Sequence, residues 1–176
     1  AIAANARVKI IDLSSEKLSA LKNIYGTHNI EYIASTEASI AEALSASDLV
    51  IGAVYVVGKE APTVVTEAML DRMTPGSVLV DISIDQGGCF ETSQPTNHDE
   101  PTYVKKGVVH YCVTNMPGAV PLTATHALNK ATLPFILDLA NKGIDRALKE
   151  DEHLLNGLNI QDGIVMHPAV KEALSV

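Results

Sequence analysis

Short apolar runs, most of them rich in β-branched residues, alternate with segments of helical character along most of this chain. The runs expected to form strands span residues 8–13, 30–34, 49–54, 77–82 and 108–113. Strands of about five residues that alternate with helices are typical of consecutive βα units. Such units form a parallel sheet with right-handed crossovers. We therefore predict an α/β fold with a doubly wound parallel sheet.

Helix boundaries follow from capping residues and from Pro and Gly. Ser14, with Ser15 and Glu16, predicts the start of a helix that runs to Tyr25, and the spacing of Ser39 and Glu42 fits a capping box. A third helix is expected over 66–73, and a long one over 123–141 that ends before Gly143. A shorter amphipathic helix and irregular chain are expected beyond residue 144.

Composition agrees with this fold and excludes several classes of partner. Aromatic residues are only 4% of the chain, so the core must consist of Ala, Val, Leu and Ile, as in buried parallel sheets. The net charge of −8 argues against nucleic acid and anionic lipid as partners. No apolar run approaches the length of a membrane helix. Two cysteines, Cys89 and Cys112, are too few for a disulfide framework, so we expect free thiols and a cytoplasmic protein.

Asp12 closes the first apolar run and is the first candidate for ligand binding. A carboxylate at such a strand end can accept both hydroxyls of an adenosine ribose, and a role in capping the next helix is equally compatible. A dinucleotide site has a Gly-rich turn about 20 residues before this acid, whereas eleven residues precede Asp12 and the chain contains no GxGxxG. We therefore predict a Rossmann-type sheet that lacks its first strand and Gly-rich turn. Residue 1 is expected to be a cut within the first Rossmann helix.

A long polar segment, residues 83–103, follows the run at 77–82. Loops of this length tend to be functional. It begins Ser83-Ile84-Asp85-Gln86-Gly87-Gly88, in which Asp85 can face a cleft and orient a water or accept a proton. A turn in which Asp85 only satisfies nearby backbone amides is the equally weighted alternative.

A second polar turn, Val113-Thr114-Asn115-Met116-Pro117-Gly118, follows the run at 108–113. Asn115 could bind an amide or a ribose, and Met116 offers an apolar surface; an ordinary exit turn is the alternative. His98 and His110 lack the spacing of a metal site, and no metal is expected. Cys89 has no paired base, so we interpret it as a structural thiol.

Several motifs together resemble the alanine dehydrogenase family. They are DLVIGAV at 48–54, PGSVLVDISIDQGGCFETSQPT at 75–96, HDEPTY at 98–103 and GVVHYCVTNMPGAVP at 107–121. The resemblance extends nearly end to end and implies a two-domain enzyme, commonly a homohexamer, that interconverts L-alanine with pyruvate and ammonia using NAD. It implies a partial NAD-binding domain at 1–121. A connecting helix and the C-terminal portion of the substrate domain would occupy 122–176.

The resemblance also assigns individual residues. Asp12 would hold the adenosine ribose with Lys17 beside it, and Ser35 would line the adenine pocket. Val54 and Tyr55 would lie over the cofactor. Asp85 matches the catalytic aspartate. The segments that would flank the nicotinamide are Ile82, Ser83, Ile84 and Asp85 together with Val113, Thr114, Asn115 and Met116.

The chain also departs from the family pattern. The catalytic histidine and the Lys and Arg that hold the substrate carboxylate belong to an N-terminal domain without a counterpart here. Pro-Leu-Thr-Ala-Thr at 121–125 stands where Pro-Arg-Thr-Ser-Thr is usual, and Gln94 stands where Arg is frequent. The nucleotide-binding subunit of a proton-translocating transhydrogenase, and a non-catalytic nucleotide-binding or oligomerisation module, remain alternatives.

Overall fold

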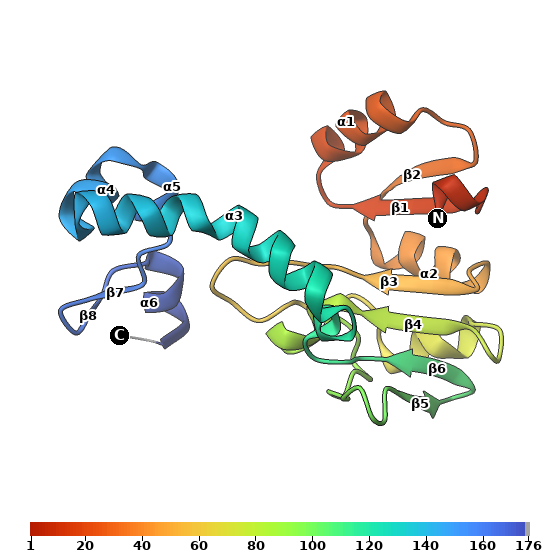
Figure 1. The fold of residues 1–176 in the computed structure, drawn as a ribbon. Coiled ribbons are helices and arrows are strands. Elements are labelled where there is room, and N and C mark those ends of the chain that lie inside the picture. The colour runs from red at the N-terminus through yellow and green to blue at the C-terminus, as the bar shows by residue number, and fades with distance from the viewer. Residues whose placement is uncertain (175–176) are drawn as a thin grey trace. The chain divides into compact units, whose positions relative to one another are not determined.

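A computed structural model describes residues 1–174 of the chain (Figure 1). The chain divides into two compact units. The first unit comprises residues 1–54 and 62–114, and the second comprises residues 55–61 together with the chain from residue 115 onward.

The first unit contains the parallel strands that the sequence predicts. β1 (Val8–Asp12) pairs in parallel with β2 (Ile30–Ala34). In a second sheet the order is β3-β4-β6-β5, in which β3 (Leu49–Gly52), β4 (Val78–Asp81) and β6 (Val108–Tyr111) are parallel. The edge strand β5 (Thr102–Lys105) runs antiparallel to β6. The predicted α/β class with a mainly parallel sheet is thereby confirmed.

The sheet is divided between β1 and β3. Within residues 1–174, β1 pairs only with β2, and β3 pairs only with β4. In a doubly wound sheet with the strand order 3-2-1-4, the first strand lies between the second and the fourth. If β1 and β2 take the second and third positions and β3 the fourth, a first strand would lie between β1 and β3. That strand is the one that the sequence analysis predicts to be absent from this chain.

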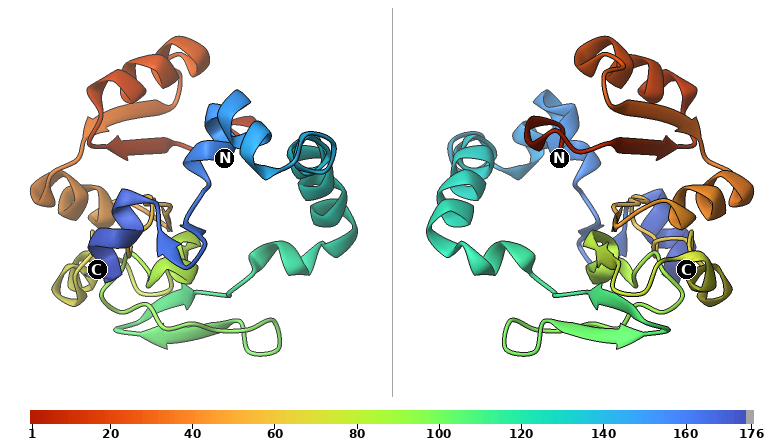
Figure 2. Two further views of the ribbon diagram at one scale, coloured as in Figure 1. Left: turned by 90° about the vertical axis from the view of Figure 1, so that its left-hand side faces the viewer. Right: turned by 90° about the vertical axis from the view of Figure 1, so that its right-hand side faces the viewer.

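The helices of the first unit differ in part from expectation. α1 (Ser15–Tyr25) begins at Ser14, whose Oγ accepts the Lys17 amide at 3.2 Å, so the predicted cap is confirmed. Figure 2 shows α1 beside the β1–β2 pair from two sides. α2 (Glu37–Ser45) has its N-cap at Thr36, and Ser39 is the third helical residue of that capping box. The box predicted from Ser39 and Glu42 was therefore wrong by one turn.

Two other segments of the first unit are less helical than predicted. The helix expected over 66–73 is a 3-10 helix, Glu67–Arg72. The chain start holds a short 3-10 helix, Ile2–Ala4, which ends at Asn5 in the left-handed conformation. The predicted irregular segment 83–103 also contains structure, since a 3-10 helix, Ile82–Gln86, follows β4 and β5 begins at Thr102.

The core of the first unit lies around β4 and β6. Leu79 and Val108 on these strands are completely buried, and Leu70 of the 3-10 helix Glu67–Arg72 is 1% exposed. Cys89 and Cys112 are buried and unpaired, as predicted. The absence of a side chain at Gly52 permits this packing, because a Cβ there would overlap Cys89 Sγ and lie 2.6 Å from Phe90 Cζ.

The second unit is mostly helical. α3 (Pro121–Lys142) contains Pro134 in its interior and has its C-cap at Gly143, where the sequence predicted its end. The expected irregular tail is instead ordered, with a β-hairpin between two short helices and a third. Its elements are α4 (Ile144–Glu150), α5 (Glu152–Asn156), β7 (Ile160–Gln161), β8 (Ile164–Val165) and α6 (Pro168–Leu174).

Little of the second unit is buried. Among its described residues only Ala147 is buried, and α3 contains no buried residue. Lys59 of the segment 55–61 forms an ion pair with Glu172 of α6 at 2.9 Å. Side chains along α3 that are large and apolar are exposed: Leu122, Leu128, Leu133, Phe135, Ile136 and Leu137.

Candidate functional site

The predicted site residues of the first unit lie at the carboxyl ends of its parallel strands. Asp12 is the last residue of β1, Ser35 follows β2, and Val54 follows β3. Ile82–Asp85 follow β4, and Val113 and Thr114 follow β6. In open parallel sheets this edge is where ligands bind. The strand order places β3, β4 and β6 side by side, so three of these groups are neighbours.

Asp12 and Ser35 form one part of the site. The Ser35 amide donates to the Asp12 carbonyl at 3.0 Å, which continues the ladder between β1 and β2 past their ends. The half-buried Asp12 carboxylate accepts the Ser14 amide on Oδ1 at 2.7 Å. No described residue bonds its Oδ2, so Asp12 can contribute to helix capping and still receive a ligand hydroxyl. Lys17 is exposed in the first turn of α1.

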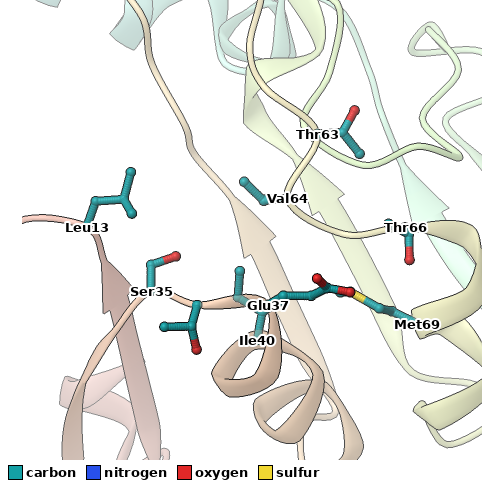
Figure 3. A pocket seen from close by; sticks show the side chains of 9 residues that line it. Leu13, Ser35, Glu37, Ile40, Thr63, Val64, Thr66 and Met69 are labelled. Atoms are coloured by element: carbon teal, nitrogen blue, oxygen red, sulfur yellow. The ribbon is translucent and has the colours of Figure 1, made fainter.

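A pocket of about 370 Å³ opens beside Ser35 (Figure 3). This volume is within the range of small-molecule sites. Figure 3 shows Leu13 and Ser35 on one side and Thr63 and Val64 on another. The Glu37 side chain extends toward Met69. Of the lining residues, only Ser35 was predicted from the sequence. Their position after β1, β2 and β3 was the available signal. The lining residues are Leu13, Ser35, Thr36, Glu37, Ile40, Thr63, Val64, Thr66 and Met69.

Asp81 dominates the end of β4. Its side chain is completely buried, and Oδ1 accepts the Ser83 amide at 2.9 Å. Oδ2 accepts the Cys89 amide at 2.8 Å and the Ser93 hydroxyl at 2.5 Å. These bonds compensate the cost of a carboxylate within the sheet. Asp81, which was not singled out from the sequence, lies at the centre of the hydrogen bonds that hold this loop.

Asp85 lies two residues beyond Ser83, whose amide donates to Asp81. It is part of the 3-10 helix Ile82–Gln86, its side chain is exposed, and no described residue forms a hydrogen bond or ion pair with its carboxylate. Ser83 is buried and its hydroxyl donates to the Val54 carbonyl at 2.8 Å, while Ile84 is buried and Ile82 is 52% exposed. The alternative in which Asp85 satisfies nearby amides is not seen; Asp81 has that role.

The remaining predicted residues follow β3 and β6. Val113 is completely buried, and the Thr114 amide donates to the Thr96 carbonyl at 3.1 Å. Asn115 and Met116 belong to the second unit, and Asn115 has a left-handed backbone conformation with φ of 52°. Tyr55 also belongs to the second unit and is 67% exposed. The structure therefore brings Val54, Ile82–Asp85, Val113 and Thr114 to one edge of the β3-β4-β6-β5 sheet, and Asp12 and Ser35 to the corresponding ends of the β1–β2 pair.

A buried polar cluster supports β6 from the side of β5. The His110 ring stacks on Tyr103 with centroids 4.9 Å apart, and its Nδ1 donates to the Val108 carbonyl at 3.0 Å. Its Nε2 lies 2.8 Å from the Thr92 hydroxyl, which donates because burial lowers the pKa of His110 and favours the neutral ring. The Tyr103 hydroxyl donates to the Thr92 carbonyl at 2.7 Å. We conclude that His110 is a core histidine.

Neither cysteine is placed as a nucleophile. Burial, followed by the charge of Asp81, raises the pKa of Cys89 to about 12, so its thiol stays protonated at neutral pH. The Tyr103 hydroxyl lies 3.6 Å from Cys112 Sγ, and burial and this neighbour raise the pKa of Tyr103 above its ordinary value. Within residues 1–174 no group of three or more His, Cys, Asp or Glu could hold a metal ion. None of the helices described there is long and apolar enough to cross a membrane.

Comparison with known proteins identifies the family. A family model described as alanine dehydrogenase/PNT, C-terminal domain, matches residues 1–168. This chain belongs to that family. Its members include the alanine dehydrogenase of Halomonas elongata, which is 52% identical over 176 residues, all of this chain and 47% of that protein. The alanine dehydrogenase of Bacillus subtilis is 49% identical over 175 residues, or 99% of this chain and 46% of that protein.

Solved structures agree with the assignment to the alanine dehydrogenase/PNT family. An L-alanine dehydrogenase matches with a TM-score of 0.84 and 47% identity, covering 99% of this chain and 48% of that one. A transhydrogenase from Sinorhizobium meliloti matches with a TM-score of 0.63 and 23% identity, covering 93% of this chain and 50% of that one, a likeness of fold alone. The chain spans about half the length of the curated relatives it matches.

Proposed function

We propose that this chain supplies the nucleotide-binding part of an NAD-dependent alanine dehydrogenase. The observation that carries the proposal is the exposed Asp85 at the sheet edge, within a sequence about 50% identical to proteins named alanine dehydrogenase. The reaction would convert L-alanine, NAD⁺ and water into pyruvate, ammonium, NADH and a proton. The transhydrogenase likeness concerns the fold, so it gives no comparable support for hydride exchange between nucleotides.

The residues of the first unit fit a dinucleotide at two places. The pocket beside Ser35 has room for the adenine, and the unbonded Oδ2 of Asp12 can accept a ribose hydroxyl. For the nicotinamide end of the dinucleotide, the relevant residue is Gln86, which follows Asp85 in the sequence. Its Oε1 is a buried acceptor without a partner among the described residues. A buried acceptor of this kind needs a donor, and the carboxamide of a nicotinamide carries one. Lys17 would lie beside the ribose site.

Around the nicotinamide we assign two segments to binding and one residue to chemistry. Ile82–Asp85, and Val113 to Met116, would flank the ring, with Val54 and Tyr55 over the cofactor. NAD would take up the hydride from the substrate carbon. Asp85 would accept the proton of the attacking water and return one to the departing amine. Residues that bind the alanine carboxylate would lie in a region that corresponds to the part of the relatives outside the match.

The proposal is tested by turnover of L-alanine. The protein, produced at the full length that its gene encodes, should form NADH from L-alanine and NAD⁺, as followed by ultraviolet absorbance. Asp85→Asn should reduce kcat by a factor on the order of 10² to 10⁴, the usual contribution of a general base, with normal folding. A folded wild-type protein without turnover would contradict the function, and a fully active variant would contradict the role of Asp85.

We also infer a cytoplasmic homo-oligomer, a hexamer by analogy with the family. The free thiols support a cytoplasmic location. The exposed large apolar side chains of α3 support association with other subunits. Light scattering of the same full-length protein should give the mass of six subunits. A monomeric mass would contradict this inference without affecting the proposed reaction.

A further inference from the structure

Within residues 1–174, all side-chain hydrogen bonds of Asp81 are to the loop that follows it. No ion pair reaches its carboxylate in the part of the chain that the structure describes, although the side chain is completely buried. Its nearest partners are instead the amides of Ser83 and Cys89 and the hydroxyl of Ser93, at 2.5–2.9 Å. The Cys89 thiol donates to Oδ1 at 3.5 Å. The Phe90 amide is a more distant donor to Oδ2, at 3.4 Å. One carboxylate thus ties positions two to twelve residues ahead of it.

These bonds fix both ends of the turn that carries Asp85. Ser83 anchors the start of the turn, and Cys89 and Ser93 anchor its end. Between them, the Gly88 amide donates to the Ser83 carbonyl at 3.1 Å. Gly88 has φ of +81°, and a Cβ there would lie 3.0 Å from Asp81 Oδ2 and 2.8 Å from Ser93 Cβ, so the turn closes tightly over the carboxylate.

A further hydrogen bond joins the turn to the chain that follows β3, the strand paired with β4. The Ser83 hydroxyl donates to the Val54 carbonyl just beyond β3, at 2.8 Å. The backbone on either side of Asp85 is therefore held to β3 and β4 together, while the Asp85 side chain itself is exposed. A rigid backbone under a free side chain is the arrangement expected for a preorganised general base.

We propose that Asp81 is the positioning residue for Asp85. This inference rests on the proposed function. Because a displacement of about 1 Å can reduce turnover by about a hundredfold, loosening the turn should lower kcat. Asp12 and Ser35 follow β1 and β2, and within residues 1–174 no hydrogen bond joins them to this loop, so binding of the adenosine ribose should change little.

Two variants of the full-length protein test the proposal. Asp81→Asn keeps the volume but turns an amide N–H₂ toward donors, and Ser93→Ala removes one anchor with less risk to folding. We expect kcat per folded molecule to fall roughly 10–100-fold for Asp81→Asn and about 3–10-fold for Ser93→Ala, with KM for NAD within about threefold. Ser93→Thr, which keeps the hydroxyl, should recover most of the lost turnover.

A double variant separates positioning from general destabilisation. If Asp81 acts through Asp85, then Asp81→Asn combined with Asp85→Asn should have the kcat of Asp85→Asn alone. Leu44→Ala, a buried position on α2, is the matched control and should lower thermal stability without lowering kcat per folded molecule. Multiplicative losses, or unchanged turnover in both Asp81→Asn and Ser93→Ala, would overturn the proposal. An inactive wild-type protein would instead remove the proposed function, and this inference with it.

Discussion

Two strands of the first unit end in the same residue and the same local bond, yet the two aspartates differ in their surroundings. Asp12 ends β1 and accepts the Ser14 amide at 2.7 Å, and Asp81 ends β4 and accepts the Ser83 amide at 2.9 Å. The Asp12 carboxylate is half-buried with one oxygen unbonded by described residues, whereas Asp81 is completely buried and bonded on both oxygens.

The difference arises from the chain that follows each strand. After β1 the chain enters α1 directly, so little of it returns over Asp12. After β4 the chain turns through two glycines and comes back over Asp81 at Cys89 and Ser93. The chain that follows each strand therefore leaves one oxygen of Asp12 unbonded by described residues and encloses both oxygens of Asp81.

The comparison predicts unequal losses of stability. Asp81→Ala leaves buried donors unbonded and should lower the free energy of unfolding by roughly 3–5 kcal/mol. Asp12→Ala removes one capping-type bond at a half-buried position and should cost about 0.5–2 kcal/mol. Denaturant unfolding of both variants measures the difference. Equal losses would show that the loop over Asp81 adds nothing to its role.

Nucleotide affinity should respond in the opposite order. If Asp12 binds the ribose, Asp12→Ala loses a charge-assisted hydrogen bond, and NAD should bind about 10–100-fold more weakly. Glu16→Ala, an exposed acid in the first turn of α1, is the matched control and should bind NAD normally. Fluorescence titration gives both constants. Unchanged affinity in Asp12→Ala would leave capping as the sole role of Asp12.

Packing over the end of β3 should tolerate no added carbon. Gly52→Ala places a methyl group against Cys89 Sγ and the Phe90 ring, which belong to the chain that returns over Asp81. The loss in unfolding free energy should be about 1–3 kcal/mol, as for other overpacked cores. Ala53→Ser adds one atom at the adjacent exposed residue and should stay within about 0.5 kcal/mol of wild type. A neutral Gly52→Ala would mean that this packing is loose.

The smallest effect concerns pH and the core beside β6. Burial lowers the pKa of His110 from its ordinary value of 6.5, so below pH 6.5 the unfolded chain binds a proton that the folded chain does not. Stability should therefore decline as pH falls through 6.5 and level off below the folded pKa. His110→Gln should remove this part of the decline in unfolding curves, while His28→Asn, at an exposed position, should retain it.

Local signals in the sequence were sufficient for most of the fold. β-branched runs marked the parallel strands, and Ser14 marked the start of α1, because these features depend on a few adjacent residues. The cap at Thr36 was missed because Ser39 offers the same chemistry one turn later. The hairpin β7–β8 gave only two residues per strand, too few for a period to be read.

The site was predictable in its parts and unpredictable in its support. Asp12 and Asp85 could be chosen because each carries a carboxylate at the end of an apolar run, whereas Ser35 was chosen only from the family resemblance. The role of Asp81 could not, because its donors are separated from it by up to twelve residues and meet only in the folded loop. The assignments of the individual binding residues remain predictions.

The antiparallel strand β5 has a consequence for the protein in a crowded solution. It is only four residues long, and the turn after it, Lys106-Gly107, has positive φ at both residues, as in tight hairpins. Lys105 pairs with Glu67 at 3.0 Å and Lys106 with Asp71 at 2.9 Å. Short, charged edges are poor templates for the strands of other molecules. This border of the sheet should therefore resist aggregation.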